Sequence, residues 1–325
     1  MHAIKSCHPY HTAALPAKHR IMYIYSLYDI LQLIFADAYR DNHTTQFPAM
    51  KKIIFVLAAV SFCCACNPKI AEGVRRKDTK KDVEFITSKG RIVLRLSDKT
   101  PLHRNNFIRL VKRSFYDSVL FHRVISGFVV QTGDPRTRPS NPASGEAAYT
   151  VPAEFVPELF HRRGALNAAR TGEETNPLQA SSGTQFTIIQ GKVYTDSLLT
   201  VTEKRITRMN AYRMVVQDPA NKWMFDRLNA NAAARDTAGA KQLRTQIDTL
   251  TSRKAAAIPA FVFPEDRRRI YKTVGGAAHL DGNYTVFGEV VAGMDVVDSI
   301  AAVKTIRERP VQDVRVLRVK LIKRN

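Results

Sequence analysis

The residues of this sequence best suited to chemistry lie between Val119 and Asp134. Arg123 stands among apolar residues that alternate as in a strand, and Phe128 and Gln131 follow it at short spacing. A guanidinium group is a fixed hydrogen-bond donor, and the side chains around it are apolar. The arrangement therefore suits a site that grips an apolar group and offers it one hydrogen bond.

Short strands must position these residues. Alternating apolar residues predict strands at 83–87, 91–96, 119–124, 128–132, 164–169, 185–190, 284–290 and 314–322. Thr100, as cap, and Pro101, at the first helical position, predict an early helix, and a late helix is expected at 294–303. The pattern is mainly β and is typical of a closed antiparallel barrel, which leaves no free strand edge.

A helical segment interrupts the strand pattern. Composition shifts at Gly191, residues 197–257 carry no strand pattern, and their apolar residues recur at roughly helical spacing. We expect a pair of helices there, followed by a helical turn that begins at Pro264. The segment is therefore predicted to be a helical insert in the β fold.

The net charge of the chain is +21. Nucleic acid, an acidic membrane surface or an acidic cell-wall polymer could attract this charge. The basic residues are scattered and no nucleic-acid motif accompanies them, so we expect no nucleic-acid partner. The histidines show no ligand spacing and no cysteine follows Cys66, so neither a metal nor another cofactor is expected. We predict a monomer.

The N-terminal region contains a signal-like segment. Residues 50–65 combine a charged start, an apolar run too short to span a bilayer comfortably, and small residues before Cys66. This order resembles a bacterial lipoprotein signal, in which Cys66 would be acylated; a cleaved signal without lipid is the alternative. The expectation is a membrane-anchored lipoprotein that faces the periplasm of the bacterial cell envelope.

The segments on either side of this signal have different interpretations. Residues 1–49 precede a complete signal, so we interpret them as an upstream over-extension without ordered structure. A genuine extension with a hydrophobic patch at 21–36 is the alternative. Residues 66–82 are polar and rich in lysine, which favours a flexible tether.

Four blocks of the sequence resemble the signature of the cyclophilins, the peptidyl-prolyl cis–trans isomerases. They are Phe121–Phe128 with Gln131–Asp134, Gly164–Arg170, Ser182–Phe186 and His279–Val290. The blocks occur in the family's order. The resemblance implies a cyclophilin-like domain formed by residues 83–190 and 271–325. Its fold would be a closed eight-stranded antiparallel barrel capped by two helices, with residues 191–270 as an insert.

The reaction implied by this resemblance is rotation about the peptide bond before proline. Its barrier is ~18–20 kcal/mol because the C–N bond is partly double. No bond breaks, so no nucleophile, metal or redox centre is needed. As the bond twists, the prolyl nitrogen gains a lone pair, and a guanidinium that donates to it favours the twisted state over both planar states. Arg123 matches the family's catalytic arginine, and Gln131 matches the glutamine that supports it.

The resemblance also implies residues that would hold the substrate. Phe128, Val129 and Leu280 match apolar positions around the proline ring, although each alone could be plain core. Ala169 and Arg170 match the pair whose main chain hydrogen-bonds an extended substrate. The Arg170 side chain would favour an acidic residue next to the proline.

Three positions depart from the family pattern. Thr187 stands where an aromatic residue usually forms the pocket floor, so we expect a wider and less apolar pocket. His279 replaces a tryptophan, and Tyr284 replaces a histidine near the substrate. The predicted function is isomerisation that assists the folding of proline-containing envelope proteins. A catalytically weak peptide-binding or scaffold module on the same fold is the alternative, and a third interpretation has the insert bind anionic polymer or lipid.

Overall fold

The hairpin predicted at the start of the domain is confirmed. Strand β1 (Lys81–Thr87) pairs antiparallel with β2 (Gly90–Leu96), so that Val83 lies opposite Leu94 and Phe85 lies opposite Ile92. All four of these side chains are buried. The computed structural model describes residues 73–139 and 149–324.

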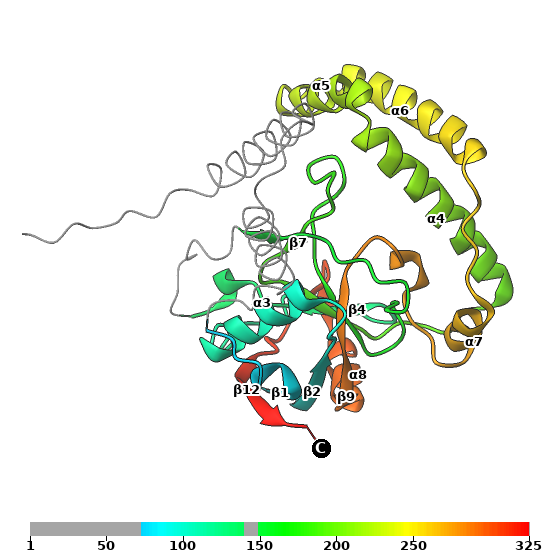
Figure 1. Cartoon of the computed structure of the whole chain (residues 1–325). Helices are drawn as coiled ribbons and strands as arrows, with labels where there is room; N and C mark the ends of the chain where they lie inside the picture. The colour runs from blue at the N-terminus through cyan, green and yellow to red at the C-terminus, as the bar shows by residue number, and fades with distance from the viewer. Residues whose placement is uncertain (1–72, 140–148, 325) are drawn as a thin grey trace, which may run out of the picture. The chain divides into compact units, whose positions relative to one another are not determined.

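Eight strands form one antiparallel sheet, in the order β12-β1-β2-β9-β6-β8-β4-β3. Figure 1 shows β12, β1, β2 and β9 side by side at one end of this order. The remaining strands are β3 (Arg123–Ile125), β4 (Val129–Thr132), β6 (Ala165–Ala168), β8 (Phe186–Ile189), β9 (Val286–Ala292) and β12 (Val316–Lys323).

The sheet curls into a half-barrel but remains open, so the predicted closed barrel is wrong. Strands β3 and β12 lie at the two ends of the order, and no ladder joins them within the described residues. Single backbone hydrogen bonds connect the segments beside these strands, from Phe121 N–H to the Val314 carbonyl and from Val316 N–H to the Val119 carbonyl, both 2.9 Å long. Strand β3 forms a ladder with β4, and on its other side Val124 N–H donates to the carbonyl of Glu308 at 2.7 Å rather than to β12.

Two helices complete the core of the sheet domain. Helix α3 (Pro101–Lys112) buries Phe107, and helix α8 (Met294–Ala301) buries Ile300, in the same apolar cluster as the strands. Pro101 takes the first helical position as predicted. Thr100 occupies the N-cap position as predicted, and its carbonyl accepts a hydrogen bond from Arg104 N–H at 2.9 Å, although its side chain makes no capping hydrogen bond.

The segment between β8 and α7 (Glu265–Thr273) forms three helices rather than the expected pair. These are α4 (Asp196–Gln217), α5 (Lys222–Ala233) and α6 (Thr237–Ala257), with α4 and α6 packed on one another (Figure 1). They share a small apolar cluster that includes Val215, Phe225 and Ile247. No described helix is long and apolar enough to cross a membrane.

The sequence does not predict two short strand pairs that the structure contains. Strands β5 (Thr150–Val151) and β7 (Ser181–Ser182) form one pair, and β10 (Thr305–Ile306) and β11 (Arg309–Pro310) form the other. The turn of the second pair consists of Arg307 and Glu308, whose φ angles are +49° and +68°. Such angles favour Gly or Asn, so these residues give no sequence signal for a hairpin.

The fold begins earlier than the predicted tether allows. Val74 is buried in the main core, and the buried Asp78 accepts a hydrogen bond from Lys112 Nζ at 2.9 Å. The prediction of a flexible tether is therefore wrong for residues 74–82, because their side chains pack on α3 and the sheet. The predictions for 1–49, for the signal at 50–65 and for Cys66 lie outside the described residues.

Candidate functional site

One cavity, about 300 Å³ in volume, brings together all nine residues that the sequence suggested for catalysis and substrate binding. They are Arg123, Phe128, Val129, Gln131, Ala169, Arg170, Thr187, Leu280 and Tyr284. Four further residues line the same cavity but were not among the predicted site residues: Asn167, Arg205, Met209 and His279. Two of these four, Arg205 and Met209, come from helix α4 of the insert.

The register of the sheet explains how the polar residues meet. Arg123 is the cross-strand partner of Gln131, Gln131 is the partner of Thr187, and Thr187 is the partner of Asn167. Residues directly opposite one another on neighbouring strands point to the same face of a sheet. The four side chains therefore form one row across β3, β4, β8 and β6.

Arg123 is held from two sides. Its Nη1 donates to Gln131 Oε1 at 3.4 Å, and the Gln131 amide donates onward to Gln185 Oε1 at 3.0 Å. Its Nε donates to Glu308 Oε2 at 2.6 Å. A guanidinium has five N–H donors, so these two contacts leave donors for a substrate.

Glu308 is a site residue that the sequence did not reveal. It lies in the turn between β10 and β11, and its carbonyl accepts a hydrogen bond from Val124 N–H at 2.7 Å. Both the main chain and the side chain of Glu308 thus contact β3. The pair is partly open to solvent, with side-chain exposures of 37% for Arg123 and 49% for Glu308, so its net contribution to stability is small.

Apolar side chains form another part of the cavity wall. Phe128 and Leu280 are partly buried against a cluster that contains the fully buried Val129. The ring of His279 lies 5.1 Å from the ring of Phe128. Burial, and next the charge of Arg205, lower the pKa of His279 to about 4. The imidazole is therefore neutral at neutral pH, which suits a wall that receives an apolar ring.

Thr187 does not present an unpaired hydroxyl to the cavity. Its Oγ1 donates to Asn167 Oδ1 at 2.5 Å, and both residues are buried. The polar atom that distinguishes Thr187 from an aromatic residue is therefore satisfied within the wall. The position of Thr187 on the cavity surface agrees with the expectation of a smaller residue at the floor.

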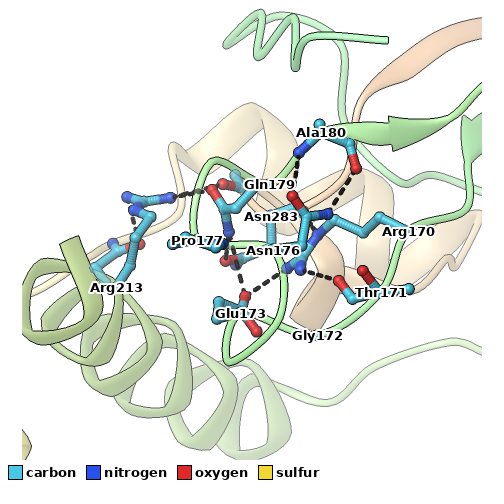
Figure 2. A network of polar contacts seen from close by, with 12 residues as sticks. Arg170, Thr171, Gly172, Glu173, Asn176, Pro177, Gln179, Ala180, Arg213 and Asn283 are labelled. Carbon is cyan, nitrogen blue, oxygen red and sulfur yellow. Dashed lines mark hydrogen bonds and ion pairs between the residues drawn. The ribbon is translucent and has the colours of Figure 1, made fainter. Parts of the chain in front are cut away.

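The Arg170 side chain cannot serve the role expected of it. Its guanidinium donates to the Asn283 and Thr171 carbonyls, at 2.6 and 2.9 Å, and pairs with Glu173 (Figure 2). It also lies 4.5 Å from the centre of the Tyr284 ring, and the side chain is only 2% exposed. The expected preference of Arg170 for an acidic substrate residue is therefore wrong, because its charge is already neutralised and buried.

In the described part of the chain, only Arg170, and not Ala169, has main-chain groups that are free to bind a peptide. The Ala169 N–H donates to the Gln185 carbonyl at 3.0 Å, and its own carbonyl accepts from Ser182 N–H at 2.7 Å. By contrast, the main-chain N–H and carbonyl of Arg170 make no hydrogen bond to any described residue. Any pairing of an extended peptide with this segment thus falls to Arg170, and Ala169 contributes through its place in the wall.

Helix α4 anchors the loop that carries Arg170. Arg213 of α4 donates to Gln179 Oε1 and to the Gly282 carbonyl, both at 3.1 Å. Gln179 in turn donates to Glu173 Oε1 and Asn283 Oδ1, both 3.3 Å away, so it contacts the same two residues that hold Arg170 (Figure 2). The insert therefore supports one wall of the cavity through a polar network, a role that its helical periodicity could not reveal.

Two further cavities adjoin the first. One, of about 300 Å³, shares Gln131, Ala169 and Arg170 with it. The other, of about 310 Å³, lies against the insert and shares Arg205 and Met209. An extended chain placed across the first cavity thus has space on either side. Within residues 73–139 and 149–324 no group of three or more His, Cys, Asp or Glu side chains could hold a metal ion.

Comparison with known proteins gives the family context of this site. A protein of Staphylococcus saprophyticus that is named after the peptidyl-prolyl cis-trans isomerases is 27% identical to this chain over 240 residues. The match covers 73% of this chain and 89% of that protein. The peptidyl-prolyl isomerase of the fungus Rhizopus delemar is 38% identical over 114 residues, covering 34% of this chain and 20% of that one. A crystal structure of a cyclophilin type isomerase from Cryptosporidium parvum, determined in the presence of the dipeptide Ala-Pro, covers 75% of this chain and 99% of that chain, with 17% identity and a TM-score of 0.43.

A family model matches the two segments of the chain that lie on either side of the helical insert. The model described as cyclophilin type peptidyl-prolyl cis-trans isomerase matches residues 82–200 and 270–321, just over half of the sequence. These two segments contain every one of the nine site residues suggested by the sequence, whereas Arg205 and Met209 fall between them. The chain belongs to the family of cyclophilin-type peptidyl-prolyl cis-trans isomerases.

Proposed function

We propose that the cavity lined by Arg123, Phe128 and Leu280 is the active site at which this isomerase rotates the peptide bond before proline. The observation that carries the proposal is the placement of one held guanidinium beside an apolar wall in the same cavity. The proline ring would lie against Phe128 and Leu280, and the main chain of Arg170 would pair with the peptide. Val129, which is buried, would back this wall.

Arg123 would act on the twisted state of the bond. In either planar state the lone pair of the prolyl nitrogen is delocalised into the carbonyl group, and it accepts no hydrogen bond. Twisting localises the pair on nitrogen, and a free N–H of Arg123 can then donate to it. An interaction made only in the twisted state lowers the barrier rather than merely tightening binding. Gln131 and Glu308 would hold the guanidinium in place.

A scaffold that binds peptides without isomerising them is the alternative function. The two are separated by nuclear magnetic resonance on an Ala-Pro peptide with increasing amounts of the protein. Our proposal predicts that cis and trans signals exchange on a subsecond timescale, whereas uncatalysed exchange takes ~10–100 s. Shifted peptide signals without faster exchange would instead support the scaffold. An Arg253→Ala variant, altered at an exposed arginine of α6, is the control and should match the wild type.

The sequence before the described residues supports a second proposal, on location. The order of charged, apolar and small residues in 50–65, followed by Cys66, favours a lipid-anchored protein of the bacterial envelope, where proline-containing envelope proteins would be the substrates. Mass spectrometry of the mature N-terminus tests this proposal. A diacylglycerol-modified Cys66 is the expected result, and an unmodified chain that retains residues 50–65 would contradict it.

A further inference from the structure

Helix α4 brings a charged residue and an apolar residue to the edge of the proposed active site. Arg205 and Met209 are four residues apart on α4, so they lie on the same face of the helix. Both line the cavity that contains Arg123. They lie outside the two segments that match the family model, so their presence in the cavity is a feature of the insert.

The position of Arg205 is fixed by its neighbours on α4. Ile206 is 1% exposed and packs in an apolar cluster with Phe263 and Tyr271. Glu203 is also buried, and its carboxylate accepts a hydrogen bond from Phe263 N–H at 2.9 Å and pairs with Arg268. The helix is thus held on both sides of Arg205, whose side chain is exposed beside the cavity.

Of the arginines that line the cavity, Arg205 is the one for which the described part of the chain supplies no partner. Three arginines line this cavity, and none of the other lining residues is acidic. Arg123 pairs with Glu308, and Arg170 pairs with Glu173. Within the described residues no hydrogen bond or ion pair engages the Arg205 side chain, so its charge remains available to an anionic group.

The charge of Arg205 acts on a group inside the cavity. After burial, it is the largest cause that lowers the pKa of His279, a residue of the apolar wall. A carboxylate bound near this wall would therefore experience a favourable field from Arg205. The walls are also partly desolvated, which strengthens such an interaction relative to one in open solvent.

The adjoining cavity of the insert gives a peptide room to reach Arg205. It shares Arg205 and Met209 with the proposed active site and continues along Leu228 and Ile247. Its other charged groups are Arg208, which is paired with Asp248, and Glu174 and Arg244. Met209 adds a flexible apolar surface between the two cavities, suited to side chains of different shapes.

We propose that Arg205 is a specificity-determining residue of the isomerase, which selects peptides that carry an Asp or Glu side chain within two residues of the proline. The inference rests on the proposed assignment of the cavity as the active site. The preference for an acidic substrate residue, which the sequence suggested for Arg170, would thus come from an arginine of the insert. The substrate class is an acidic, proline-containing peptide segment.

The test compares blocked peptides that carry Glu or Gln at one of the four positions flanking a single proline. Magnetic resonance line shapes give the dissociation constant and the exchange rate of each peptide separately. The proteins are the wild type, Arg205→Gln, and Lys204→Gln. Lys204 is an exposed residue of α4 that lines no cavity near the site, so the control removes the same charge from the same helix.

With the wild type, kcat/KM for the Glu peptide should exceed that for the Gln peptide about 2- to 5-fold in at least one position, as expected for one partly exposed ion pair. Arg205→Gln should bring this ratio to about one, whereas Lys204→Gln should preserve it. Raising the ionic strength from about 0.05 to about 0.5 M should reduce the preference.

The binding readout separates this inference from the proposed function. A Glu preference in the dissociation constants that depends on Arg205, without faster exchange, would support the selectivity and contradict the isomerase site. Faster exchange with equal constants for the Glu and Gln peptides at all four positions would overturn the role of Arg205. So would a Glu preference that Arg205→Gln leaves unchanged.

Discussion

The carboxylate of Glu308 accepts a hydrogen bond from Arg123 Nε at 2.6 Å. Glu308 lies in a tight turn far along the chain from Arg123, and its main chain is tied to β3 through Val124. The contact leaves other N–H groups of Arg123 free for the prolyl nitrogen. Glu308 therefore fixes the direction of the guanidinium without occupying all of its donors.

Removing the Glu308 side chain should disorder Arg123. We expect Glu308→Ala to lower kcat/KM for an Ala-Pro peptide about 3- to 10-fold, the effect of losing one orienting hydrogen bond. Glu308→Gln keeps an acceptor oxygen and should stay within about twofold of the wild type, since the orientation survives. Exchange spectroscopy measures both. A Glu308→Gln variant as slow as Glu308→Ala would show that the charge, rather than the orientation, matters.

The floor of the cavity offers a test by stability. Thr187→Val keeps the volume of the side chain but removes the donor to Asn167 Oδ1, leaving a buried acceptor unpaired. We expect the free energy of unfolding to fall by about 1–3 kcal/mol. The KM for a proline peptide should change less than about twofold, because the lost hydroxyl faces Asn167.

A double variant provides the control for the floor pair. Asn167→Leu combined with Thr187→Val removes both polar partners, so it should recover part of the stability lost in Thr187→Val alone. Urea unfolding measures Thr187→Val, Asn167→Leu and the double variant. Strictly additive losses would contradict a hydrogen bond between the two side chains.

His279 predicts a particular dependence of stability on pH. Its pKa is about 4 in the folded protein, because it is buried and near Arg205, and about 6.5 when exposed. Between these values the unfolded chain binds more protons than the folded one, so the free energy of unfolding falls as the pH falls from about 6.5 toward about 4. The lost stability should be on the order of 2 kcal/mol, allowing for partial exposure.

The contribution of His279 is isolated by a substitution that cannot titrate. Wild type and His279→Gln should be unfolded in urea at about pH 7.5 and about pH 4.5. His279→Gln will lose packing against Phe128 at both pH values, but the wild type should lose on the order of 2 kcal/mol more between them. Equal losses in the two proteins would show that His279 is not held neutral in the folded state.

The sequence predicts strands that carry Arg123 and Gln131, because apolar residues alternate there and the family motif covers both. The first strand is observed at Arg123–Ile125 rather than 119–124, and the register of the pair comes from the structure alone. It also identifies nine of the residues that line the cavity, since these lie on strands or short loops within or beside the motif blocks, but it does not place Asn167 or His279 there. The closure of the sheet could not be predicted in this way. Alternation determines which face of a strand is buried, but it does not determine whether a three-residue strand pairs on both sides.

Glu308 and Arg205 illustrate what sequence patterns cannot supply. Glu308 reaches Arg123 through a turn of two non-glycine residues with positive φ, a conformation that leaves no sequence signal. Arg205 reaches the cavity because α4 packs on the sheet domain through Ile206 and Arg213. Helical periodicity predicts the apolar face of α4 but not the surface on which that face packs.

The rate at which Arg123→Ala isomerises an Ala-Pro peptide tests the central claim most directly. The account predicts a loss of about 10- to 100-fold in kcat/KM, because a hydrogen bond from a charged donor contributes about 1.5–3 kcal/mol to the twisted state. The dissociation constant of the peptide should change far less, and the unfolding midpoint should match that of the wild type. A folded Arg123→Ala protein that isomerises the peptide as fast as the wild type would contradict the assignment of Arg123.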